Sequence, residues 1–168
     1  AGFNTADLGA MNDSSKAIMT LMMLIGGSPG STAGGMKTTT IAVLILNAFA
    51  TFGREAETEV FGRRFDNTVV KNAATIAILY FFLFFTGGIA ISQIEHAALS
   101  DCLFVTASAV GTAGLTLGIT TELGLVSHLI LVVLMYLGRV GGLTLIYAAI
   151  SVKIQSGAKR PLDKITVG

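Results

Sequence analysis

The sequence predicts an all-α membrane protein built from membrane–pore-loop–membrane repeats, with a broken helix and re-entrant pore loops. The 168 residues are 52% hydrophobic and 12% charged, about half the charge of an ordinary soluble domain. One glycine-rich stretch interrupts a long apolar segment, and a second follows a helix that is too short to cross a bilayer. Backbone polar groups in hydrocarbon need partners, so irregular stretches at that depth persist only inside protein or beside water.

The predicted broken helix lies in residues 17–52. A single helix of that length would extend about 54 Å, whereas the bilayer core is about 30 Å thick. The interruption GGSPGSTAGGMKTTT (26–40) therefore predicts two helical pieces around an irregular loop. A discontinuous helix of this kind is typical of an ion or substrate pathway.

Two uninterrupted spans are predicted further along, at 72–94 and 124–152. Between them, 97–110 is too short to cross, and the loop GTAGLTLGIT (111–120) follows it directly. This order favours a re-entrant pore loop. The alternative is an extracellular loop that contains a short amphipathic helix, but an exposed loop has no need to be so apolar.

The distribution of Lys and Arg predicts the topology. Eight of the 11 fall in two stretches, 54–71 and 153–168, and the chain has none between Lys71 and Arg139. The positive-inside bias places both stretches in the cytoplasm and residues 95–127 mainly outside or dipping inward.

An internal repeat appears at an offset of 112 residues. Ala1-Gly2-Phe3 aligns with Ala113-Gly114-Leu115, Ser15 with Ser127, and Gly26 with Gly138. Each copy runs from a glycine loop through a short polar spacer into an apolar helix, so the two copies share one order of elements.

Several function classes find no support. The net charge of +1 gives no sign of nucleic-acid binding, and the single cysteine, Cys102, has no metal-ligand spacing around it. No Ser/His/Asp, HExxH or CxxC arrangement suggests an enzyme. The stretch from Gly30 to Gly35 has the glycine spacing of a phosphate-binding loop, but Met36 precedes Lys37 and the flanks are membrane helices.

The second loop has the chemistry of a potassium site. A dehydrated potassium ion needs several neutral oxygens, which backbone carbonyls supply where glycine lets the chain turn them inward. Thr112-Ala113-Gly114-Leu115 provides small residues and no charge. Asp101 and Glu122 flank this region as cap or vestibule charges, so the acidic ring of a divalent-cation filter is missing from the loop.

Four motifs in order resemble the Trk/Ktr/HKT superfamily of potassium transporters. They are AGFNT (1–5), the stretch 26–40, SAVGTAGLTLGIT (108–120) and MYLGRVGGLTL (135–145). The GRVGGLTL stretch and the RPLDKITVG tail look most like the Ktr-type membrane subunit. That family has four membrane–pore-loop–membrane repeats, and this chain resembles the back half only.

The resemblance implies a division of the chain. Residues 1–53 would be the end of repeat three, with its filter loop and broken second helix, and 54–71 a cytoplasmic loop. Residues 72–152 would be repeat four, and 153–168 a cytoplasmic tail. The missing N-terminal half, a homodimeric arrangement in the plasma membrane's lipid bilayer and a cytoplasmic nucleotide-binding regulatory ring are the implied partners. Potassium is the expected transported ion, with sodium as a second candidate and no organic cofactor.

The resemblance also implies site residues. The selectivity filter would comprise Ala1, Gly2, Phe3, Thr112, Ala113, Gly114 and Leu115. The intramembrane gating loop would comprise Gly30, Ser31, Thr32, Ala33, Gly34 and Gly35, with Lys37 and Arg139 beside it.

Two cations have open interpretations. Arg139 lies in the last predicted span, where an unpaired arginine is costly. We expect it to bind backbone carbonyls of the broken helix; the alternative is snorkelling to the cytoplasmic interface. Lys37 either faces the pore near the loop or reaches the interface from a helix start. The rival to the transporter as a whole is a structural or assembly module of a membrane complex that does not conduct by itself.

Overall fold

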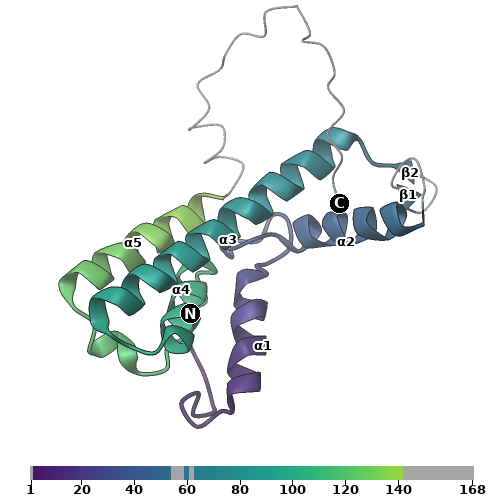
Figure 1. Cartoon of the computed structure of the whole chain (residues 1–168). Coiled ribbons are helices and arrows are strands. Elements are labelled where there is room, and N and C mark those ends of the chain that lie inside the picture. The colour runs from purple at the N-terminus through teal and green to yellow at the C-terminus, as the bar shows by residue number, and fades with distance from the viewer. Residues whose placement is uncertain (1, 54–58, 61–62, 142–168) are drawn as a thin grey trace, which may run out of the picture.

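The computed structural model describes residues 2–53, 59–60 and 63–141 (Figure 1). The described elements are, in chain order, helices α1 (Asp13–Leu24) and α2 (Thr38–Phe52), strands β1 (Glu59–Val60) and β2 (Arg63–Arg64), helices α3 (Asn67–Glu95) and α4 (Leu99–Val110), the short 3-10 helix η1 (Ile119–Thr121) and helix α5 (Leu125–Val140). The filter candidate Ala1, residues 142–152 of the last predicted span and the tail 153–168 lie outside the described residues.

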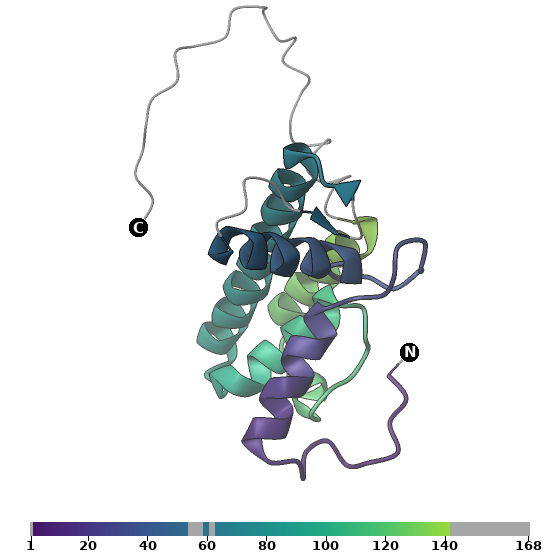
Figure 2. The same ribbon diagram turned by 90° about the vertical axis from the view of Figure 1, so that its right-hand side faces the viewer.

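The predicted break in the first apolar segment is confirmed. Helix α1 ends at Leu24, α2 begins at Thr38, and the chain changes direction sharply between them (Figures 1 and 2). The start of α1 is set by Asn12, whose side chain accepts a hydrogen bond from the Ser15 N–H at 2.8 Å, as an N-cap residue does. The glycines and proline between the helices cannot support a continuous ladder of i→i−4 bonds.

The predicted cytoplasmic loop contains a small feature that the sequence reading did not include. Strands β1 and β2 pair in antiparallel register, with Glu59 opposite Arg64 and Val60 opposite Arg63. The pair lies beyond the C-terminal end of α2 and close to the start of α3 (Figure 1).

Helix α3 is longer than the predicted span 72–94. It begins at Asn67 because the Asp66 side chain caps it, accepting from the Thr68 N–H at 3.2 Å. It ends at Glu95, and the next residue, His96, has a φ of 52°. Within the part of the chain that the structure describes, α3 is the one helix long and apolar enough to cross a membrane; α2, α4 and α5 are shorter apolar helices.

Helix α4 forms the centre of the packing. It contacts α1, α3 and α5, while α2 packs against the first half of α3 (Figures 1 and 2). Every residue from Phe104 to Val110 is buried, as is Cys102. A short helix that is buried almost all round agrees with the half-length element predicted at 97–110 and argues against the alternative of an exposed amphipathic helix.

The last helix is described for the first part of the predicted span 124–152, since residues 142–152 lie outside the described residues. Helix α5 ends at Val140, and Gly141 follows with a φ of 88°. Glycine adopts that left-handed backbone at little cost, so it ends the helix where the apolar pattern alone gave no stop.

The two copies of the internal repeat occupy corresponding elements. Helix α1 begins at Asp13 and α5 at Leu125, the same offset of 112 residues that separates Gly2 from Gly114. They differ at their ends, since α1 stops at Leu24 and α5 continues through Gly138 and Arg139. The residues that correspond to most of the glycine-rich interruption, 142–152, lie outside the described residues.

Candidate functional site

The loop after α4 leaves the helix through a hydrogen-bonded end motif. The Ala113 N–H donates to the Ser108 carbonyl at 2.9 Å, and the Thr112 N–H donates to the Ala109 carbonyl at 3.1 Å. This pair of bonds, with Thr112 at a φ of 52°, is the Schellman arrangement. It fixes where the predicted filter segment starts relative to the buried helix.

The two predicted filter loops lie against each other. The Gly2 N–H donates to the Ala113 carbonyl at 3.0 Å, and a Cβ placed on Gly2 would lie 2.4 Å from the Gly114 carbonyl oxygen. Gly2 and Gly114 have φ values of 72° and 80°. Both positions therefore require glycine for backbone conformation, and Gly2 also requires it for space.

The flanking filter residues differ in their surroundings. Phe3 is 94% exposed, whereas Leu115 is half-buried and packs on the hydrophobic core. Gly114 is exposed, although its carbonyl oxygen lies against Gly2. The Ala113 carbonyl accepts from the Gly2 N–H in the other loop.

The glycine-rich interruption closes into a loop with a bonded base. The Met36 N–H donates to the Leu24 carbonyl at 3.1 Å, and the Met36 carbonyl accepts from the Gly26 N–H at 2.6 Å. The Thr38 N–H also donates to the Gly27 carbonyl at 3.3 Å. These bonds hold the end of α1 beside the start of α2 and leave residues 28–32 as an exposed tip.

Three consecutive carbonyls of this loop are bound by cationic side chains. The Lys37 ammonium donates to the Ser31 carbonyl at 3.0 Å and to the Ala33 carbonyl at 2.7 Å. The Arg139 guanidinium donates through Nη1 to the Thr32 carbonyl between them. In a continuous helix, backbone N–H groups would donate hydrogen bonds to these carbonyls. In this loop, the charged side chains of Lys37 and Arg139 donate them instead.

Both cations therefore lie where the loop needs donors. Arg139, in the last turn of α5, makes the contact with broken-helix carbonyls that the sequence led us to expect. The Lys37 contacts favour a position beside the loop over the interfacial alternative. The gating role of either residue stays a prediction.

A hydrogen bond connects the predicted gating loop to the predicted filter segment. The Gly34 N–H donates to the Thr112 hydroxyl at 2.8 Å. Gly34 and Gly35 are buried, and a Cβ on Gly35 would lie 3.1 Å from the Leu24 carbonyl oxygen. Gly30, at the tip, has a φ of 83° and open space around it.

Sequence reasoning missed several residues that position these loops. Glu95, at the end of α3, accepts from the Gly124 N–H at 2.8 Å and from the Ser127 hydroxyl at 2.5 Å, and so caps α5, whose own N-cap residue is a glycine. Tyr80 donates its hydroxyl to the Gly138 carbonyl at 3.3 Å. In the sequence, the only signs of these roles were that Glu95 is an acidic residue at the end of an apolar span and that Tyr80 is the single tyrosine within that span.

The described residues contain no cluster of carboxylate, imidazole or thiol groups suited to a metal ion. None of them forms a group of three or more His, Cys, Asp or Glu side chains that could hold a metal ion. Asp101 lies in the first turn of α4 and Glu122 ends η1, in keeping with caps rather than ligands. Any ion that binds the described residues at these loops would rely on neutral oxygens.

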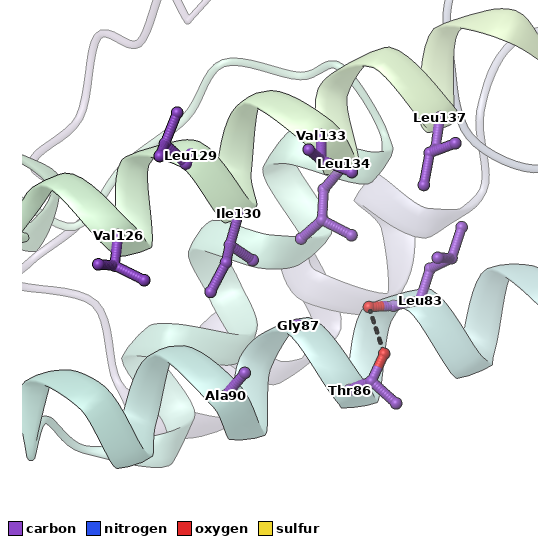
Figure 3. A pocket seen from close by; sticks show the side chains of 10 residues that line it. All are labelled: Leu83, Thr86, Gly87, Ala90, Val126, Leu129, Ile130, Val133, Leu134 and Leu137. Atoms are coloured by element: carbon purple, nitrogen blue, oxygen red, sulfur yellow. Dashed lines mark hydrogen bonds between the residues drawn. The ribbon is translucent and has the colours of Figure 1, made fainter.

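A groove of about 400 Å³ separates α3 from α5 on the outer surface (Figure 3). It is lined by apolar side chains apart from Thr86, whose hydroxyl donates within α3 to the Phe82 carbonyl at 2.6 Å. The lining of the groove is therefore almost entirely apolar.

Comparison with known proteins identifies the family. Residues 1–158 match the TrkH family model, described as a cation transport protein. Ktr system potassium uptake protein B of Bacillus subtilis is 33% identical over 168 residues, which cover all of this chain and 38% of that protein. Potassium/sodium uptake protein NtpJ of Enterococcus hirae is 32% identical over 174 residues, covering all of this chain and 39% of that protein.

A third relative, Ktr system potassium uptake protein B of Vibrio alginolyticus, is 38% identical over 149 residues, covering 88% of this chain and 32% of that protein. The chain thus spans less than two fifths of the length of each of these relatives. The family is one of membrane transporters and not of enzymes, as the sequence led us to expect. With the family model matching nearly its whole length, this chain belongs to the TrkH family of cation transport proteins.

Proposed function

We propose that this chain contributes the end of the third and the whole of the fourth membrane–pore-loop–membrane repeat to a potassium uptake transporter. In this proposal, carbonyls around Gly2 and Gly114 form two sides of a selectivity filter, and residues 30–35 form a gate beneath it. The names of the relatives, which refer to potassium uptake and in one case to potassium and sodium, support this ion class.

The contact between the two glycine loops is the observation that carries the proposal. Segments more than a hundred residues apart meet through the bond from Gly2 to Ala113, and both glycines hold the left-handed backbone. A filter built from several repeats needs such loops to converge on one axis, with carbonyls in place of an ion's water shell.

The charge pattern favours a monovalent ion. The filter candidates carry no carboxylate, and rings of acidic side chains are the usual device where more highly charged cations are selected. Sodium is a second candidate ion, since neutral carbonyl oxygens bind both alkali cations.

The remaining components are proposed from the resemblance to the Ktr type. The first two repeats and the start of the third would come from sequence that precedes this chain in the full-length protein. Two such proteins would form a dimer in the plasma membrane, and a cytoplasmic nucleotide-binding ring would regulate them. The rival proposal is an assembly module that supports a membrane complex without conducting.

Uptake by the full-length protein tests the proposal. We expect it to restore growth and potassium uptake in cells that lack their own potassium uptake systems. An assembly module would restore neither, although it would reach the membrane.

Gly114→Ser in that full-length protein should lower the preference for potassium over sodium. The new Cβ strains a backbone with a φ of 80° and adds a competing hydroxyl beside the ion path. Relative uptake of the two ions is the measurement. Gly118→Ser is the matched control, because Gly118 shares the positive φ, at 97°, but has nothing within 4 Å of a Cβ. Equal ion preference in the Gly114 variant and the unmodified protein would remove Gly114 from the filter.

A further inference from the structure

Thr112 holds a backbone conformation that β-branched residues rarely adopt. Its φ is 52°, a left-handed value at which a branched side chain crowds its own backbone. A left-handed residue often follows a helix end, but glycine or asparagine normally fills that position. A strained backbone persists only where the surrounding structure imposes it, and strained residues cluster at functional sites.

The conformation of Thr112 directs its hydroxyl at one N–H group. The Gly34 N–H donates to the Thr112 hydroxyl at 2.8 Å. The acceptor is held firmly, because the Thr112 backbone is itself bonded to the Ala109 carbonyl at the end of α4.

Gly34 is enclosed around this bond. A Cβ on Gly34 would lie 2.7 Å from the Thr112 hydroxyl oxygen, 2.5 Å from the Thr112 methyl carbon and 3.0 Å from the Gly138 carbonyl oxygen. The glycine-rich loop therefore approaches the filter base and α5 at the same point, and only a residue without a side chain fits there.

This bond links the predicted filter loop to the glycine-rich loop. Each of its two residues is next to a residue that makes another contact of its own loop. On one side, Thr112 precedes Ala113, whose carbonyl accepts from Gly2 in the opposite filter loop. On the other side, Gly34 follows Ala33, whose carbonyl accepts from Lys37. A displacement of the loop that broke the bond would act on the residue next to the contact between the filter loops.

We propose that the Thr112 hydroxyl is the latch that holds the glycine-rich loop against the base of the filter and couples the state of the loop to the filter. Thr112 is then a positioning residue for the gate, in addition to its place in the filter segment. This inference rests on the proposed function and adds to it a side-chain contact that regulates ion passage. Opening the gate separates the Gly34 N–H from the Thr112 hydroxyl.

Two variants of the full-length protein remove the hydroxyl with opposite effects on the backbone. Thr112→Val keeps the branched shape, and Thr112→Gly accommodates the left-handed φ without strain. Both should raise potassium uptake threefold to tenfold, since a net hydrogen bond contributes a factor of about that size. Thr112→Ser keeps the hydroxyl and should restore the uptake rate toward that of the unmodified protein.

A matched control and a second background separate the latch from a general effect on the filter. Thr116→Val removes a hydroxyl from the same loop, but that hydroxyl bonds to Thr120 and Gly118 and should leave gating unchanged. In a protein from which residues 30–35 are deleted, Thr112→Val should have no further effect on uptake, because the donor is absent. A Val effect that persists in this background together with an altered potassium/sodium ratio would assign Thr112 to the filter alone.

Hydrogen–deuterium exchange tests the bond independently of transport. Backbone exchange in residues 26–36 should accelerate in Thr112→Val and Thr112→Gly, and not in Thr112→Ser. Unchanged exchange in both hydroxyl-free variants overturns the latch. If the unmodified full-length protein moves no potassium, the proposed function fails, while the exchange result still decides whether Thr112 holds the loop.

Discussion

At the scale of single residues, several glycines mark places where backbones touch. A Cβ on Gly138 would lie 2.0 Å from the Val110 carbonyl oxygen, and a Cβ on Gly111 would lie 2.1 Å from the Met23 carbonyl oxygen. Small residues allow this approach of helices in membrane proteins, where association depends on packing rather than on the exclusion of water. These contacts fix α1 and α5 against the end of α4.

Gly138→Ala should destabilise the protein much more than Gly87→Ala. Both glycines are helical, so each alanine gains helix propensity of about 1 kcal/mol. The new methyl at 138 meets the α4 backbone, whereas the methyl at 87 meets the Leu134 side chain at 2.6 Å, which can change rotamer. We expect a loss of about 1–3 kcal/mol or more for Gly138→Ala, measured as a lower melting temperature in detergent. Equal melting temperatures for the two variants would contradict the close backbone contact.

At the scale of elements, the glycine-rich loop depends on its neighbours for its hydrogen bonds. Backbone hydrogen bonds between Leu24, Gly26 and Met36 close the base of the loop. Lys37 and Arg139 donate hydrogen bonds to its carbonyls. The tip carries few contacts of its own, which is the condition for a segment that opens at low cost. The element is thus held from outside at a small number of points.

Loosening those points should raise ion flux. Arg139→Ala removes the donor to the Thr32 carbonyl, and deletion of several residues within 30–35 shortens the proposed barrier. A change of about 1.4 kcal/mol alters the open population tenfold, so either variant should increase potassium uptake several-fold and weaken its regulation.

The control is Arg139→Lys, which keeps the charge at the end of α5 and one donor group. Its uptake should lie between that of the unmodified protein and that of Arg139→Ala. Unmodified uptake rates in both Arg139→Ala and the shortened loop, at equal membrane levels, would place the gate elsewhere.

At the scale of the whole molecule, charge and apolar surface give the orientation. Large exposed apolar side chains line the outer faces of α3 and α5, among them Ile78, Phe82, Leu129, Val132 and Tyr136. Lipid or neighbouring repeats would cover such surface in a membrane. The Lys and Arg residues gather at one end of the predicted spans, in 54–71 and 153–168.

The positive-inside bias predicts that residue 63 faces the cytoplasm and residue 122 the outside. Arg63→Cys should resist an impermeant thiol reagent added to intact cells, and Glu122→Cys should react with it. Cys102 is buried, so the native thiol of this chain should contribute little background. Ready labelling at position 63 from outside would reverse the predicted topology.

The class and the order of the elements follow from short stretches of consecutive residues. Apolar runs, the glycine-rich break and the half-length helix predicted the membrane class, α1 and α2 as separate helices, and α4 as a short one. These features are local, because span length and helix breaking depend on consecutive residues. The motifs around Gly2 and Gly114 also predicted the family, which the match over residues 1–158 confirms.

The first and last residues of the helices depend on capping side chains and backbone conformations, which the pattern of apolar residues does not reveal. Asp66 begins α3 early, and Gly141, with its positive φ, follows the end of α5 at Val140. A helix end is set by one side-chain hydrogen bond or by one residue with positive φ, and the hydropathy of the segment reports neither.

Contacts between distant residues depend on how the helices pack in three dimensions. The bond from Gly2 to Ala113 and the bond from Gly34 to Thr112 join segments that no local pattern pairs. Periodicity specifies which face of a helix is apolar, but a hydrogen bond requires two groups within about 3 Å in a set direction. That proximity arises from packing α1, α3 and α5 around α4, and it brings the filter candidates and the glycine-rich loop to one place.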